Sequence, residues 1–395
     1  MLSSLRTTST ELLQRYAQAP PSINLNLASL LSFGRPATPG SVLSSVTIAL
    51  EEIPRRLAMR VHSLQSLPFI VGTNPSIAKT LETYRDSFQL LATYPPVKTL
   101  EDNQRFTQQL EALVERHAND VPTMAKGFLE SAKYMSPTQI SNFLDSAIQN
   151  RISVRLIAEQ HIAISRALEE ARTGYVGVVD TQLKVERMIR MCESYVAELC
   201  AATLGASPVV EIDGEVDAAF AYIPVHLEYM LTEILKNSFR ATVEHHHKKS
   251  HQAPLPPVRI TLVTAGDTGS FFSIRIRDEG GGVSPSNMAR IFSYAFTTAK
   301  SDDDPDAGGG PYAAQHVGGL ANIGGDNSHL FAEMTSKGLQ TGLGSIAGLG
   351  YGLPMSKLYA KYFGGSLELV SLEGWGADLF LKLRCLSDEA GSSVI

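Results

Sequence analysis

The sequence predicts two domains: a helical bundle, followed by an α/β layer domain in which helices cover a sheet. Through the first half of the chain, apolar residues recur at spacings of three and four, whereas much of the second half alternates in the manner of strands. With 395 residues, the chain is also too long for one small core. We therefore expect the bundle over residues 1–178 and the layer domain over residues 179–395.

The expected bundle rests on long amphipathic segments, of which residues 42–64 and 103–135 are the clearest. Proline and glycine breaks near 68–75, 95–96 and 137 separate these segments. Four or five long helices joined by short connections are typical of a bundle.

The layer domain is expected to begin with a helix over residues 180–204 and to mix further helices with strands. The further helices span 225–247, 285–293 and 353–363, and a glycine-rich tract occupies 302–350. The expected strands span 207–212, 257–265, 270–278, 365–371 and 377–385. Helices mixed with antiparallel strands in this way fit a single sandwich.

Composition argues against several classes of protein. The net charge of −6 does not suit a nucleic-acid binder driven by phosphate neutralisation. Cys192, Cys200 and Cys385 have no metal-site spacing and suit a reducing compartment. No stretch offers the roughly 18 uninterrupted apolar residues of a membrane helix. The first 20 residues are equally consistent with a weak transit peptide and with a plain N-terminal helix.

The segment TEILKNSFRATVEHHHKK, residues 232–249, lies in one of the expected helices. Its apolar residues form one broad stripe, which must face a core. Glu233, Asn237 and Arg240 fall on a narrow polar stripe beside it, with the first two one turn apart. The same polar stripe holds His226, Tyr229 and Glu244. On this helix alone, a solvated face and a functional site both remain open.

Asp278 ends the strand expected over residues 270–278. Phe272, Ile274 and Ile276 point to one side of that strand, and Asp278 continues the apolar side. A carboxylate in such a place is costly unless a donor meets it. Three glycines follow at 280–282, where the backbone can take positive φ or admit a close ligand. An inward Asp followed by three glycines indicates a site more than a simple turn.

The segment GLGYGLPMSKLYAKYFGG, residues 348–365, opens another helix with alternating glycines. Glycines at a helix start present free N–H groups and the positive end of the helix dipole to an anion. The dinucleotide fold is disfavoured because no strand precedes these glycines. The phosphate-loop pattern GxxxxGK[ST] is absent from the sequence.

In this order, the ExxxN helix, the strand ending in DxGxG, the glycine-rich lid and the GxGxG helix start resemble the Bergerat ATP-binding fold of gyrase B, Hsp90, histidine kinases and MutL. Several strings further resemble the mitochondrial protein kinases of the 2-oxo acid dehydrogenase complexes, namely the pyruvate and branched-chain kinases. In the second half they are ILKNSFRAT (234–242), RDEGGG (277–282), FTTA (296–299) and GLGYGLPMSKLYAKYFGG (348–365). In the helical half they are SLPF (66–69), HANDVPTMAKG (117–127) and RISVRLIAEQH (151–161).

The resemblance implies roles for individual residues. Glu233 would be the general base on a substrate serine, and Asn237 would ligate the Mg²⁺ that bridges the phosphates of ATP. Asp278 would accept a hydrogen bond from the adenine amino group, and Arg240 would lie beside the phosphates. K⁺ is a further candidate cofactor. The remaining implied nucleotide-binding residues are Gly280, Gly282, Thr297, Thr298, Gly348, Leu349, Gly350, Tyr351, Gly352 and Leu353.

For the helical half, the resemblance implies a pocket for a small 2-oxo acid effector, whose carboxylate suits arginine. It also implies docking to the lipoyl domain of the E2 core. The implied enzyme is a homodimeric serine kinase of the mitochondrial matrix that phosphorylates and switches off the E1α subunit of the pyruvate dehydrogenase complex. The implied pocket residues are Tyr84, Ser87, His117, Arg151 and Arg155.

Two departures from the family pattern keep alternatives open. Tyr229 stands where the pyruvate dehydrogenase kinases have His, and Ala377 stands where the family has Thr after Gly376. The alternatives are a kinase of the branched-chain complex, a catalytically silent nucleotide-binding regulator, and a sensor histidine kinase. For the last, His161 lacks the surrounding dimerisation sequence, so we expect it to pack in the bundle or line a pocket. We expect no metal at the histidines of segment 245–251.

Overall fold

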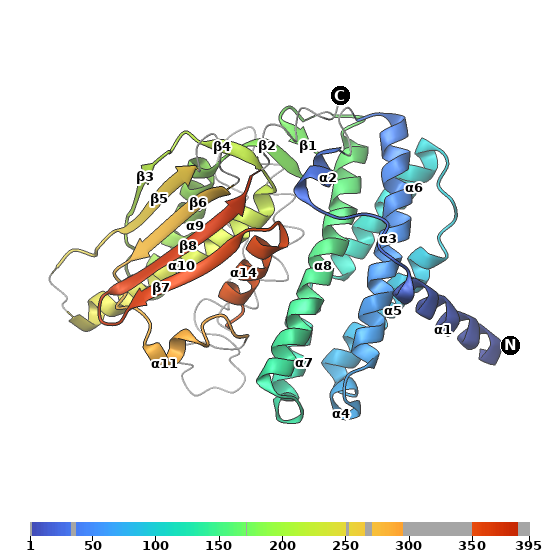
Figure 1. The fold of residues 1–395 in the computed structure, drawn as a ribbon, viewed down its shortest axis with the longest axis horizontal. Coiled ribbons are helices and arrows are strands. Elements are labelled where there is room, and N and C mark those ends of the chain that lie inside the picture. The colour runs from blue at the N-terminus through green and yellow to red at the C-terminus, as the bar shows by residue number, and fades with distance from the viewer. Residues whose placement is uncertain are drawn as a thin grey trace. The chain divides into compact units, whose positions relative to one another are not determined.

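The computed structural model describes residues 2–32, 37–170, 172–249, 253–264, 271–294 and 350–385. The chain divides into two compact units, Met1–Val179 and Asp180–Ile395. The first is helical, and the second combines helices with a five-stranded sheet (Figure 1). The expected fold class, a helical bundle followed by an α/β domain, is confirmed.

The first unit consists almost entirely of helices. None of the described helices is both long and apolar enough to cross a membrane. The short strand β1 (Tyr175–Val176) closes the unit. Its helices are α1 (Leu2–Gln18), α2 (Leu27–Ser32), α3 (Pro39–Gln65), α4 (Phe69–Gly72), α5 (Pro75–Ala92), α6 (Leu100–Arg116), α7 (Asp120–Glu130), the 3₁₀ turn η1 (Ala132–Tyr134) and α8 (Pro137–Arg166).

Reciprocal caps fix where three of the long helices begin. Thr38, Thr99 and Ser136 each accept a hydrogen bond from the amide three residues on, whose side chain bonds back to the cap amide. Pro39 and Pro137 then occupy the first helical position, where proline costs no hydrogen bond. The proline at 137, expected only as a break, is therefore the start of the longest helix.

His161 lies inside the bundle, on α8, with 1% of its surface exposed. Its Nδ1 is 2.6 Å from the Ser45 hydroxyl, and its Nε2 is 3.3 Å from the Thr107 hydroxyl. Burial lowers the pKa of His161 from its usual value of 6.5 to about 4. A side chain so enclosed packs the bundle, as expected, and cannot present a phosphate to another protein.

The buried His161 makes a pH dependence of stability predictable. Between about pH 6.5 and pH 4 the unfolded chain binds a proton that the folded chain refuses, so the free energy of unfolding falls as the pH falls. We expect this residue to contribute a loss of roughly 2 kcal/mol between pH 7 and pH 5. Urea unfolding of His161→Gln should show a smaller decrease than the unaltered chain, whereas the exposed-site control His62→Gln should not. An equal dependence of the free energy of unfolding on pH in all three proteins would contradict a buried, neutral His161.

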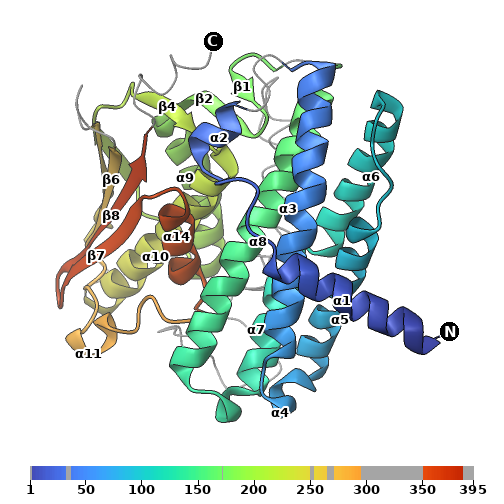
Figure 2. The same ribbon diagram turned by 45° about the vertical axis from the view of Figure 1, so that its right-hand side comes forward.

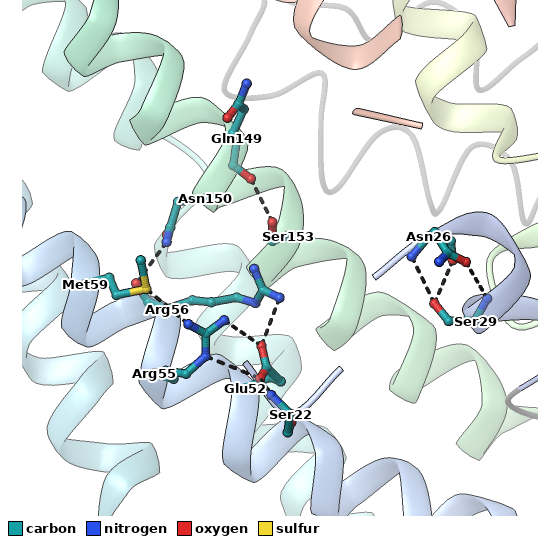
Figure 3. Close-up of polar contacts among 10 residues, drawn as sticks. All are labelled: Ser22, Asn26, Ser29, Glu52, Arg55, Arg56, Met59, Gln149, Asn150 and Ser153. Atoms are coloured by element: carbon teal, nitrogen blue, oxygen red, sulfur yellow. Dashed lines mark hydrogen bonds and ion pairs between the residues drawn. The ribbon is translucent and has the colours of Figure 1, made fainter. Parts of the chain in front are cut away.

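Glu52 of α3 holds the segment between α1 and α2, residues 19–26, which we call the N-terminal segment (Figure 3). Its side chain is fully buried and pairs with Arg55 and Arg56, at 3.0 and 2.9 Å. The same carboxylate accepts hydrogen bonds from the amide and the hydroxyl of Ser22, at 2.6 and 3.0 Å. Burial alone would raise the pKa of Glu52, but the bonds from Arg55 and Ser22 and the charge of Arg56 outweigh it, and the pKa is lowered. A buried carboxylate with this many donors stays charged and holds the segment in place.

The second unit is an α/β domain. Its helices are α9 (Val185–Leu204), α10 (Pro224–Lys249), α11 (Pro285–Met288) and α14 (Gly352–Tyr362). Its strands are β2 (Val179–Lys184), β3 (Val210–Gly214), β4 (Ala219–Tyr222), β5 (Val258–Thr264), β6 (Phe271–Asp278), β7 (Ser366–Leu372) and β8 (Gly376–Arg384).

The main sheet has the order β3-β5-β6-β8-β7 and is antiparallel except between β3 and β5. The helices α9, α10 and α14 lie on one of its faces (Figure 2). Alternate residues of β6 point toward those helices, so Phe272, Ile274 and Ile276 are buried. Asp278 follows the same alternation and is 8% exposed, which confirms the prediction that it continues the apolar side.

The boundary of the first helix of this unit differs from the sequence expectation. Residues 180–184 were expected to be helical, but they belong to β2, which pairs antiparallel with β4. The strand β4 was not expected at all. Each strand is short, and its stability depends on a partner about 40 residues away in the chain, which local periodicity cannot indicate.

Candidate active site

Helix α10 presents the expected base and metal ligand. Its apolar stripe is fully buried, at Leu227, Leu231 and Ile234 among others, and it packs against α9, α14 and β6. Glu233 is partly buried beside this stripe, and Asn237 is exposed one turn later. The helix therefore places both side chains on the same edge of its buried face, as the spacing predicted.

Both oxygens of the Glu233 carboxylate have close neighbours. Oε1 forms an ion pair with Lys236 Nζ at 2.7 Å, and the two side chains are only 17% and 14% exposed. Oε2 lies against Gly352, because a Cβ atom added to that glycine would overlap it. A side chain at 352 would therefore displace the Glu233 carboxylate from the start of α14.

Two tyrosines adjoin the same carboxylate. Burial, and then the charge of Glu233, raise the pKa of Tyr195 to about 12. Burial and the same charge also raise the pKa of Tyr229, whose ring packs on Tyr359 with centroids 5.2 Å apart. At pH 7 both phenols are therefore neutral. Tyr229, which stands where the family has His, remains close enough to Glu233 to affect its environment.

Asn237 and Arg240 have neighbours on α10 itself. The Asn237 amide nitrogen donates to the main-chain oxygen of Glu233 at 2.7 Å. This bond uses Nδ2 and leaves the side-chain carbonyl oxygen as the atom that can ligate a hard cation. The Arg240 guanidinium pairs with Glu244 at 2.6 Å. Both residues of this pair belong to the polar stripe of the helix.

His226 corrects the helical-wheel prediction for α10. It was placed on the polar stripe, but it is 6% exposed and packs on Tyr359 and Phe363, with ring centroids at 4.7 and 5.8 Å. The reason is that α14 and the turn after it cover this side of α10 as well. The ring is therefore part of the packing between α10 and α14.

Asp278 has donors for one oxygen of its buried carboxylate. Oδ1 accepts hydrogen bonds from the amides of Gly280 and Ala377, at 2.9 and 3.3 Å, and the Ser238 hydroxyl also bonds the side chain. Burial raises the pKa of Asp278 against the opposing effect of these bonds. The main chain of Ala377 thus supports the carboxylate although the hydroxyl expected in the family is missing.

The glycines after Asp278 have structural reasons. Gly281 and Gly282 have positive φ, +81° and +70°. Gly280 lies so close to Ala241 of α10 that a Cβ atom would be 2.5 Å from that side chain. The three glycines therefore allow the chain to turn after β6 while it packs closely on α10. This is a packing role, and a nucleotide-binding role for Gly280 and Gly282 stays a proposal.

The start of α14 is described from Gly350 onward. Gly350 has φ +75°, Tyr351 is buried with its ring 5.2 Å from that of Tyr294, and Gly352 begins the helix, followed by Leu353. In the described part of the chain, α14 has neither an acid in its first turn nor a side-chain cap. The other expected nucleotide-binding residues, Thr297, Thr298, Gly348 and Leu349, lie outside the described residues.

A separate pocket lies in the first unit. It is small, and four of the five expected effector residues line it: Tyr84, His117, Arg151 and Arg155. The fifth, Ser87, does not line the pocket but is buried, and its hydroxyl lies 2.8 Å from Nε2 of His117. The remaining lining residues are Leu57, Leu113, Val114 and Val154.

The polar groups of this pocket are held by internal contacts. His117 Nδ1 is 2.5 Å from Asp120, and Arg151 donates to the main-chain oxygens of His117 and Ala118, at 3.4 and 3.3 Å. Arg155 pairs with Glu159 at 2.6 Å. Within the described ranges, the buried Arg151 Nε has no hydrogen-bond partner. The pocket thus carries a guanidinium group with a donor available for an anion.

Three side chains near the nucleotide-site residues were not expected from sequence: Lys236, Ser238 and Tyr195. Lys236 and Ser238 lie within five residues of Glu233, yet an ion pair and a buried hydroxyl cannot be read from spacing alone. Tyr195 comes from α9, whose packing on α10 is a tertiary contact. Over the described residues, no three His, Cys, Asp or Glu side chains gather as a metal site would.

Comparisons with known proteins agree on one family. Residues 24–180 match the family model of the mitochondrial branched-chain alpha-ketoacid dehydrogenase kinase, and residues 222–327 match the histidine kinase-, DNA gyrase B- and HSP90-like ATPase model. The chain is 32% identical to a mitochondrial pyruvate dehydrogenase (acetyl-transferring) kinase of Arabidopsis thaliana, covering 92% of this chain and 91% of that protein. It is 30% identical to the mitochondrial pyruvate dehydrogenase (acetyl-transferring) kinase isozyme 4 of Mus musculus, over 98% of this chain and 86% of that protein. It is 29% identical to the mitochondrial pyruvate dehydrogenase (acetyl-transferring) kinase of Drosophila melanogaster, over 98% of this chain and 87% of that protein.

Proposed function

This chain belongs to the mitochondrial pyruvate dehydrogenase kinase family, and from that premise we propose that it is an ATP-dependent protein serine kinase that phosphorylates and inactivates the E1α subunit of the mitochondrial pyruvate dehydrogenase complex. The observation that carries the proposal is the arrangement of α10, where Glu233 lies against the first residue of α14 and Asn237 follows Glu233 one turn later.

The residues present fit ATP and Mg²⁺. Asp278 is a buried carboxylate with one oxygen fixed by main-chain donors, which suits recognition of the adenine amino group by the other. The Asn237 carbonyl oxygen suits Mg²⁺, which binds few protein ligands and takes others from phosphates. The first amides of α14 suit an anion. When bound, ATP supplies the phosphoryl group.

Glu233 is proposed to take the proton of the substrate serine hydroxyl as the phosphoryl group is transferred. Tyr195 and Tyr229 are neutral neighbours of this carboxylate. We expect the chain to use Tyr229 where its relatives use His, so its rate and its pH dependence need not equal theirs.

Residues 1–178 are proposed as the regulatory domain and residues 179–395 as the kinase domain. The regulatory domain would dock the lipoyl domain of the E2 core, and its pocket would bind a small 2-oxo acid. The family context further supports a homodimer and a location in the mitochondrial matrix, with K⁺ as a second cation.

The effector pocket gives a testable prediction. Arg151→Gln removes the buried guanidinium and should raise the pyruvate concentration needed for half of the effect on kinase activity by about 10-fold or more. Kinase activity without pyruvate should change little. The control Arg166→Gln alters an exposed arginine of the same helix and should leave the response to pyruvate intact. An unchanged response in Arg151→Gln would exclude this pocket.

A kinase of the branched-chain complex is the second candidate, because the model that matches the helical half is described by that activity. Transfer of label from [γ-³²P]ATP should be measured on purified E1 of both complexes, with E1 activity followed in parallel. Label on pyruvate dehydrogenase E1α, with loss of its activity, is the expected result. Label only on branched-chain E1 would favour the second candidate, and label on neither would favour a catalytically silent regulator.

A further inference from the structure

The ion pair between Lys236 and Glu233 has a chemical consequence for the proposed base. A general base must offer a lone pair to the serine hydroxyl. In this structure Oε1 accepts from the Lys236 ammonium at 2.7 Å, while Oε2 lies against Gly352. In the chain as it stands, Oε1 is therefore occupied by the Lys236 ammonium, while Oε2 adjoins the first residue of α14.

The position of Glu233 is also one that suits an anion in general. The first amides of a helix carry partial positive charge and lack intrahelical partners. Among the described residues, α14 has no acid in its first turn and no side-chain cap, and the Glu233 carboxylate adjoins its first residue. Lys236 adds a full positive charge on the other side, 14% exposed. The Glu233 carboxylate therefore lies between the start of α14 and the Lys236 ammonium.

A terminal phosphate has more negative charge and more acceptor oxygens than a carboxylate, so it would compete well for the same donors. A lysine has three donors on a flexible stem and can exchange partners without moving the helix. The Lys236 ammonium contacts Oε1 of Glu233, and Oε2 of the same carboxylate adjoins the first residue of α14.

We propose that Lys236 is a partner-exchanging residue, which binds Glu233 in the free chain and the terminal phosphate of a nucleoside triphosphate in the loaded chain. The exchange frees Oε1 of Glu233 when a terminal phosphate is present. This inference rests on the proposed nucleotide site, but it assigns to Lys236 a role in telling triphosphate from diphosphate.

The test is the ratio of affinities for a non-hydrolysable ATP analogue and for ADP, both with Mg²⁺, measured by titration calorimetry on the full chain. Lys236→Met should weaken analogue binding by about 10-fold or more and leave ADP binding unchanged. Lys236→Arg keeps the charge and should retain most of the preference. The control Lys248→Met removes an exposed lysine of the same helix and should match the unaltered chain.

Glu233→Gln tests the exchange from the other partner. With the competing charge removed, Lys236 should be available at all times, so the analogue should bind more tightly than to the unaltered chain, with ADP unaffected. Equal losses for analogue and ADP in Lys236→Met, or an unchanged ratio, would overturn the proposal, as would weaker analogue binding by Glu233→Gln. Thermal unfolding of each variant identifies any loss of nucleotide binding that is due to misfolding. If Lys236→Met is misfolded, the analogue-to-ADP affinity ratio of Lys236→Arg tests the proposal instead.

The outcomes also separate this inference from the proposed function. If the ratio depends on Lys236 while neither E1 protein accepts label, the exchange stands and the kinase proposal fails. If E1 is labelled and the ratio does not depend on Lys236, the kinase proposal stands and the exchange fails. A chain that binds neither nucleotide would overturn both.

Discussion

Replacement of Glu233 by Gln is expected to lower the rate of phosphoryl transfer to E1α by roughly 10²–10⁴, the range associated with loss of a general base. The amide keeps the volume that fits beside Gly352, so the start of α14 should not rearrange. It cannot, however, accept the serine proton. Single-turnover kinetics with saturating ATP isolate this step from nucleotide binding.

Glu198→Gln serves as the control for this variant, because Glu198 is an exposed carboxylate on the neighbouring helix α9. It should behave as the unaltered chain. If Glu233→Gln transferred phosphate at the normal rate while still binding nucleotide, Glu233 would have no part in the chemistry, and another group would have to be sought.

Asp278→Asn is expected to weaken the binding of both ATP and ADP by roughly 100-fold, which corresponds to one lost hydrogen bond to a charged group. The amide oxygen can still accept from Gly280 and Ala377, which preserves the junction of β6 and β8. The new amide nitrogen is a donor and meets the adenine amino group with the wrong polarity. Calorimetric titration with ADP measures the effect without turnover.

The sheet supplies a matched control one register position away. Asp378 lies on β8, opposite Arg277, and its side chain pairs with Arg275 and Arg277 on the other face of the sheet. Asp378→Asn makes the same chemical change away from the helices and should leave nucleotide affinity unaltered. Equal losses in the two variants would mean that Asp278 acts through the stability of the strands and has no contact with adenine.

Much of the proposed site was predictable because its signals are local. The period of two along β6 placed Asp278 on the buried side, and the period of a helix placed Asn237 beside Glu233. The glycine start of α14 was recognisable for the same reason. Such features need only the geometry of one element.

The partners of these residues were not predictable, because they come from distant parts of the chain. Ala377 reaches Asp278 through the pairing of β6 with β8, across 99 residues of sequence. His226 had a polar position on an isolated wheel and became buried because α14 packs over it. Lys236 is close to Glu233 in sequence, but whether the two side chains form an ion pair depends on which side of α10 is enclosed.

The contact of the N-terminal segment with Glu52 implies unequal tolerance to substitution. Position 22 contributes its main-chain amide, and it is the first residue after Pro20 and Pro21 able to do so. In a saturation library, position 22 should therefore accept most residues at a modest cost and reject proline, since only proline removes the donor. Position 52 should reject nearly all replacements, because the buried guanidinium of Arg55 and the largely buried one of Arg56 would be left without their acid. The contact between Ser22 and Glu52 should thus tolerate most substitutions at position 22 and very few at position 52.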